Sequence, residues 1–118
     1  MIKKMIVLLI IDIIFIKFVS SNFFVKMIEK IQNKPFKLNI TGAIISYFLI
    51  LLGQYLFVEP FKKIYSKRKY YLNAFLLGIV TYGIFDFTNI AIFRDYEFMP
   101  AIIDTLWGGI INMLIAYF

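Results

Sequence analysis

The 118-residue sequence contains no cysteine and no histidine. The absence of cysteine excludes disulfides and thiol chemistry, and the absence of histidine removes the imidazole bases and metal ligands of many enzymes. Charged residues make up only 17% of the chain, whereas 62% is hydrophobic. Soluble domains have about a quarter charged and about half apolar residues, so this chain has too little polar surface to cover a globule in water. The composition predicts an integral membrane protein.

The apolar residues fall into four segments, each close to the roughly 20 residues that an α-helix needs to cross a hydrocarbon core ~30 Å thick. The predicted spans cover about residues 5–19, 38–59, 71–93 and 99–118, in a single membrane domain of residues 1–118. The remaining residues suffice only for short loops. We therefore predict an all-α fold, a four-helix transmembrane bundle.

The first segment has two features of a secretory signal peptide, since Lys3 and Lys4 precede a long apolar run. However, Asp12 and Lys17 lie inside that run, and both residue types are unusual in the apolar part of a signal peptide. We therefore expect a retained first span.

Residues 20–33 have apolar side chains at helical spacing, with lysines on the opposite side. The apolar side chains are Phe23, Phe24, Met27, Ile28 and Ile31. This pattern predicts an amphipathic helix at the membrane interface. The alternative is that the first span continues to Val25 and then becomes a loop, and the sequence leaves open whether the span ends near Val19 or Val25.

A basic cluster interleaved with tyrosines separates the second and third predicted spans. It consists of Lys62, Lys63, Lys67, Arg68 and Lys69. In a short loop between two spans, such a cluster is typical of the cytoplasmic side and attracts anionic headgroups, so we interpret it as a topology signal and not as a nucleic-acid site. With Lys3 and Lys4 it places seven basic residues on one side, against five on the other. The bias predicts that both termini are cytoplasmic.

Three aspartates fall inside the predicted spans, where a charged carboxylate opposes insertion by about 2.5 to 3.5 kcal/mol at the helix centre. Counting from the nearest span ends at about 1.5 Å per residue places Asp86 and Asp104 at the same depth, roughly 10 Å from one side of the membrane. Asp12 reaches that depth if the first span ends near Val19. We predict that these carboxyl groups form a polar layer between the helices.

Neighbouring residues extend this predicted layer. Tyr82 and Asn89 share a helix face with Asp86, and Asn112 shares one with Asp104. Small residues at four-residue intervals predict close helix packing. They include Ala74 with Gly78, Ala101 with Thr105 and Gly109, and Gly42 with Ser46.

The polar layer is compatible with several functions. It is either structural, with hydrogen bonds holding the helices in register, or a site for a proton or a hard cation such as Mg²⁺ or Ca²⁺. Lys17 and Arg94 lie close enough to neutralise an aspartate, or extend outward to the headgroups instead. A lipid-modifying enzyme with paired aspartates is an alternative, but the sequence has no nucleophile elbow or phosphate-binding loop and indicates no cofactor. We therefore favour a protein without enzymatic activity.

Residues 82–91 (YGIFDFTNIA) and 104–108 (DTLWG) resemble the characteristic sequence of a family of small membrane proteins, domain of unknown function 2177. The resemblance continues through Asp12, Tyr47 and Pro60. It implies a four-helix membrane protein without implying a particular activity. It also implies a set of characteristic residues: Tyr82, Asp86, Thr88, Asn89, Asp104 and Trp107. Family members usually have tryptophan where this chain has Phe15 and Tyr96.

The chain also resembles the small multidrug resistance transporters, which work as dimers, in its length and in the first-span carboxylate Asp12. The resemblance ends there, because the polar residues of this chain are concentrated in the last two predicted spans. A small dimeric transporter coupled to protons or cations is therefore an alternative function. The expected partners are membrane lipid and a second copy of the chain.

Overall fold

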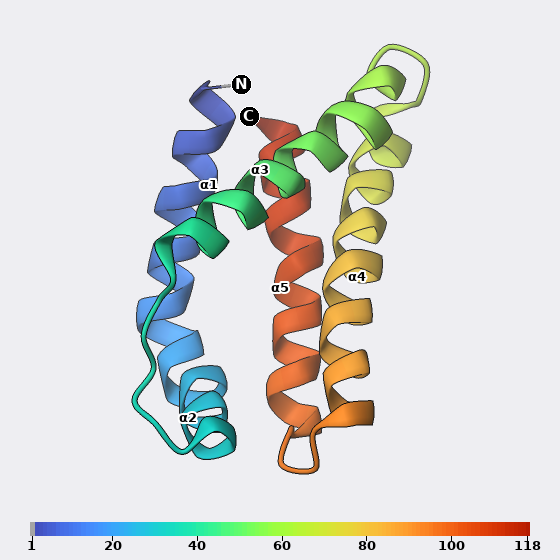
Figure 1. Cartoon of the computed structure of the whole chain (residues 1–118). Coiled ribbons are helices and arrows are strands. Elements are labelled where there is room, and N and C mark those ends of the chain that lie inside the picture. Colours follow the sequence, from blue (N-terminus) through green and yellow to red (C-terminus); the bar gives the residue numbers. More distant parts are fainter. Residues whose placement is uncertain (1) are drawn as a thin grey trace.

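The structure is a computed structural model that describes residues 2–118, and these residues form helices and connecting segments without a strand. The helices are α1 (Ile2–Phe15), α2 (Ser21–Gln32), α3 (Ile40–Phe57), α4 (Lys67–Ile92) and α5 (Phe98–Tyr117). The start of α1, the end of α5 and the α3–α4 connection lie at one end of the molecule, and α2 and the α4–α5 loop lie at the other (Figure 1). The prediction of an all-α membrane protein is confirmed.

Three helical segments are long and apolar enough to cross a membrane: Ile40–Phe61, Lys67–Ile92 and Phe98–Tyr117. Large apolar side chains such as Ile44, Phe48 and Ile84 are exposed on them. Exposed apolar surface on this scale is unfavourable in water and is suited to lipid tails. The outer surface of the protein therefore fits a hydrocarbon environment.

The first helical segment is longer than predicted. A π-helical turn (Ile16–Ser20) joins α1 directly to α2, so the chain is helical from Ile2 to Gln32. Neither Val19 nor Val25 is therefore the end of a helix. The helix stops at Asn33, which has a φ of 54° in the left-handed region that asparagine adopts more readily than most residues.

The predicted amphipathic helix corresponds to α2, with its lysines exposed. Its apolar stripe contacts protein as well as the surroundings: Met27 is buried against Tyr96 and Ala101, near the start of α5. Phe24, Ile28 and Ile31 are partly buried in the same cluster. Part of the stripe that we assigned to the membrane interface thus fixes α2 to the rest of the fold.

Side-chain caps define the starts of α3 and α4. The Asn39 side chain accepts a hydrogen bond from the Gly42 amide at 3.1 Å, and Ser66 accepts one from the Lys69 amide at 3.3 Å. Because Ser66 caps α4, the last three residues of the basic cluster form its first turn. The helix therefore begins four residues before Tyr71, where we placed the start of the third span.

The backbones of the antiparallel helices α4 and α5 approach each other closely at Gly78 and Gly108. A Cβ atom added to Gly78 would lie 1.9 Å from the carbonyl oxygen of Gly108, so glycine is needed for this contact. Small residues thus allow α4 and α5 to pack closely, as predicted. Gly42 and Ser46 do not have this role, because both are exposed on α3. Helix α3 crosses the other helices obliquely (Figure 1).

Candidate functional site

The centre of the candidate site is a pair of aspartates on facing helices. Asp86 of α4 is completely buried, with an exposed fraction of 0%. Its Oδ1 accepts a hydrogen bond from the Tyr96 hydroxyl at 2.7 Å, and its Oδ2 accepts one from the Thr105 hydroxyl at 3.2 Å. Asp104 of α5 lies close to Asp86. We refer to Asp86 and Asp104 as the carboxyl pair.

The short α4–α5 loop positions Tyr96. Its backbone amide donates to the Phe93 carbonyl at 3.2 Å, and this turn directs the side chain back toward Asp86. Asn89 also lies close to Tyr96. Burial raises the pKa of Tyr96 above its ordinary value, and the hydrogen bond to Asp86 raises it further. Tyr96 therefore remains a neutral hydroxyl donor.

A second acidic group joins three helices. The Tyr47 hydroxyl of α3 donates to Asp12 Oδ2 at 2.5 Å, and the Trp107 indole of α5 donates to Asp12 Oδ1 at 2.9 Å. The ring of Phe15 stacks on Trp107, with 4.2 Å between ring centroids and 3° between planes. We refer to Asp12, Tyr47 and Trp107 as the Asp12 cluster.

Tyr82 lies between the carboxyl pair and the Asp12 cluster, close enough to interact electrostatically with all three aspartates. Its ring covers Gly108, where a Cβ atom would lie 2.2 Å from the Tyr82 ring. The structure thus gathers the aspartates that we assigned to one polar layer. Among residues 2–118, however, no three acidic side chains are close enough to hold a metal ion together.

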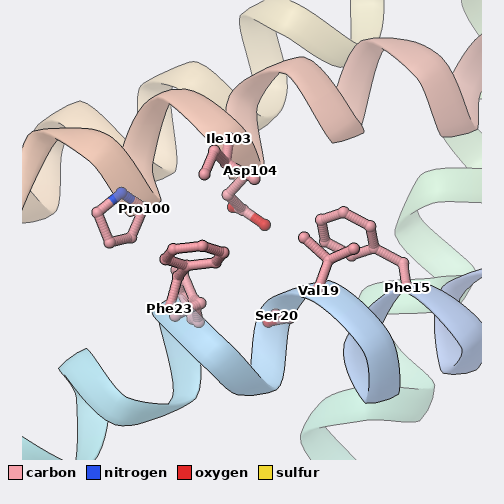
Figure 2. A pocket seen from close by; sticks show the side chains of 8 residues that line it. Phe15, Val19, Ser20, Phe23, Pro100, Ile103 and Asp104 are labelled. Carbon is pink, nitrogen blue, oxygen red and sulfur yellow. The ribbon is translucent and has the colours of Figure 1, made fainter.

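Asp104 also faces the first helical segment. Figure 2 shows its carboxyl group pointing from α5 toward Val19 and Phe23. The cavity between them has a volume of only about 10 Å³, at the lower limit for a single water molecule. Apolar side chains therefore border the carboxyl pair on this side.

Four of the predicted site residues lie outside this arrangement or at its edge. Thr88, Lys17 and Arg94 are exposed, and Asn89 is half-buried beside Tyr96. The single ion pair in the described part of the chain joins Lys4 and Glu59 at 3.3 Å, near the termini. Within residues 2–118, Lys17 and Arg94 therefore form no ion pair with an aspartate. Their exposure corresponds to the alternative in which they extend outward to the headgroups.

Sequence reasoning did not identify several hydrogen-bonding partners. Tyr47, Thr105 and Tyr96 were not selected as site residues, although each donates to an aspartate. Gln54 was also missed: its Nε2 donates to Asn112 Oδ1 at 2.8 Å in a buried contact between α3 and α5. A hydroxyl or amide inside an otherwise apolar span was the available signal for Tyr47, Thr105 and Gln54.

The helices and the buried network of carboxyl, hydroxyl and indole groups define a small helical membrane protein with a polar interior. The model of a protein family described as "Predicted membrane protein (DUF2177)" matches residues 1–118, and the chain belongs to this family. The resemblance noted in the sequence is thereby confirmed. No curated protein and no solved structure matches the chain.

Proposed function

We propose that this multi-pass membrane protein binds a proton at the carboxyl pair, and that the proton links α4 to α5. One observation carries the proposal: Asp86 is completely buried, lies close to a second carboxyl group and accepts hydrogen bonds from two hydroxyl donors. In the described chain no basic side chain forms an ion pair with either aspartate.

Electrostatics favours one shared proton. Two adjacent carboxylates away from water repel each other strongly, and such pairs retain a proton between them. The protonated carboxyl then donates a hydrogen bond to the other, while Tyr96 and Thr105 donate to Asp86. This arrangement leaves at most one negative charge on the pair.

A proton suits the site better than a hard cation. Calcium takes six to eight oxygen ligands and magnesium demands near-octahedral coordination, as a rule. Both Asp86 oxygens already accept hydrogen bonds from hydroxyl groups, so their lone pairs are directed at donors and not at a metal position. Hydrogen-bond donors around a carboxyl group therefore favour proton binding over metal coordination.

The groups that face the carboxyl pair are few. Tyr82 approaches from α4, Tyr96 from the loop, and Asp12 from α1. Asp12 is the single additional acid among them, and both of its oxygens accept hydrogen bonds. The pH dependence of stability is therefore expected to report mainly on the carboxyl pair.

Thermal unfolding in detergent across a range of pH tests the proposal. The native pair retains a proton that unfolded aspartates release, so the stability of the protein falls as pH rises. Asp104→Asn keeps a hydrogen-bonding side chain but cannot ionise, and we expect it to flatten the profile. Asp95→Asn is the matched control, because Asp95 is exposed in the adjoining loop. A wild-type profile in Asp104→Asn would refute proton binding, and destabilisation without a change in profile would support a purely structural role.

We also propose that both termini face the cytoplasm. They lie at the same end of the fold as the α3–α4 connection (Figure 1), which contains Lys62 and Lys63. The basic residues are more numerous at this end. The test is a fusion of the carboxyl terminus to a phosphatase that is active only outside the cytoplasm. We expect this fusion to be inactive, and an active fusion would show the opposite orientation.

A further inference from the structure

A lateral groove opens between α3 and α4, where α3 crosses the other helices. Its volume is about 870 Å³, within the ~300–1,000 Å³ typical of small-molecule sites. The walls are largely apolar and include Leu49, Leu52, Leu56, Leu77 and Phe85. A hydrocarbon chain from the bilayer would meet a chemically similar surface along these walls.

Polar side chains from four helices also line the groove: Asp12, Tyr47, Tyr82 and Asp104. Two of these side chains are acidic, and none of the residues lining the groove is basic. Asp104 thus lies close to Asp86 and also borders the groove. The groove combines apolar walls with an acidic region that no side chain of its lining neutralises.

We propose that the groove binds an amphiphile with an ammonium group on a hydrocarbon chain. The chain lies against the leucine and phenylalanine walls, and the ammonium group donates hydrogen bonds toward Asp12 and Asp104. The acidic lining attracts the positive charge and repels an anionic amphiphile of the same length. This inference goes beyond the proposed proton site, because it concerns a ligand that enters from the membrane.

Trp107 provides a direct reporter, because it is the only tryptophan and its indole donates to Asp12. The full-length protein in nonionic detergent is titrated with a long-chain alkylammonium probe brominated near its polar end, and quenching of Trp107 fluorescence is recorded. The matched probes are an alcohol and a carboxylate with the same brominated chain. We expect the ammonium probe to bind about tenfold more tightly than the alcohol, and the carboxylate to bind more weakly than either.

Two α3 variants separate groove binding from general partitioning into detergent. Ser46→Phe adds a ring to a residue that lines the groove, whereas Ile45→Phe adds one at an exposed position outside it. Quenching by the ammonium probe should be lost in Ser46→Phe and retained in Ile45→Phe. Asp12→Asn should reduce the preference for the ammonium probe over the alcohol.

Equal quenching by the three probes, or unchanged quenching in Ser46→Phe, would overturn the inference. Neither result affects the proton site, which is tested without an amphiphile by the pH profile of Asp104→Asn. The converse outcome is also possible. If quenching depends on the charge of the probe but Asp104→Asn has the wild-type pH profile, amphiphile binding in the groove is supported and proton binding by the carboxyl pair is refuted. The two proposals therefore fail independently.

Discussion

The contact between Gly78 and Gly108 allows a quantitative prediction about the α4–α5 pair. In Gly78→Ala, the new methyl group would lie 1.9 Å from the Gly108 carbonyl oxygen and 2.8 Å from the Gly109 Cα. These atoms belong to the backbone, so a change of side-chain rotamer cannot relieve the overlap. The helices must separate by more than about 1 Å to restore ordinary contact distances, and overpacking of this kind costs about 1–3 kcal/mol.

Replacing glycine by alanine inside a helix also contributes about 1 kcal/mol of favourable helix propensity. Because the overlap involves backbone, we take the upper end of the overpacking range and expect a net loss of about 2 kcal/mol in Gly78→Ala. Gly83→Ala is the matched control on the same helix, since its Cβ would lie 3.4 Å from Thr105 Cγ2. The control should be neutral or slightly stabilising.

Thermal unfolding followed by circular dichroism in one detergent compares the two variants with the wild type. The prediction is a lower melting temperature in Gly78→Ala and an equal or higher one in Gly83→Ala. If the two substitutions change stability equally, the protein does not have the close backbone contact between α4 and α5.

Three further predictions concern the polar network. Tyr96→Phe leaves an Asp86 oxygen without its hydroxyl donor and should lower the unfolding free energy by about 1–3 kcal/mol, and an unchanged melting temperature would contradict this contact. Trp107→Phe keeps an aromatic ring beside Phe15 but removes the donor to Asp12, with an expected loss of the same size; wild-type unfolding in urea would argue against the Asp12 cluster. Replacing Lys17 or Arg94 by Gln should leave the pH profile of stability unchanged, because both are exposed; a flattened profile would show that they act on the carboxyl pair.

The apolar segments of the sequence sufficed to predict a helical membrane fold. Asp86 and Asp104 could be matched in depth because a five-residue loop joins their helices, so equal counts from the loop give equal depths. Thr88 fell outside the site because position along a helix does not specify which face is buried. A single sequence with this much apolar surface contains little periodic contrast between lipid-facing and protein-facing sides.

Contacts between helices that are not neighbours in sequence were harder to predict. Tyr47 reaches Asp12, and Gln54 reaches Asn112, only because α3 crosses the other helices at its particular tilt and rotation. Neither quantity follows from span length or from residue spacing. The sequence also left open whether the first helix continues through residues 16–20, since an amphipathic pattern after an apolar run does not distinguish a new helix from the continuation of the first.

Infrared spectroscopy of the purified protein, in a detergent without ester groups, tests proton binding by the carboxyl pair most directly. A protonated carboxylic acid has a carbonyl band distinct from that of a carboxylate. We expect this band in the wild type and in Asp95→Asn at neutral pH, and its loss when Asp86, Asp104 or both are replaced by Asn. A wild-type spectrum at neutral pH with carboxylate absorption alone would contradict the shared proton.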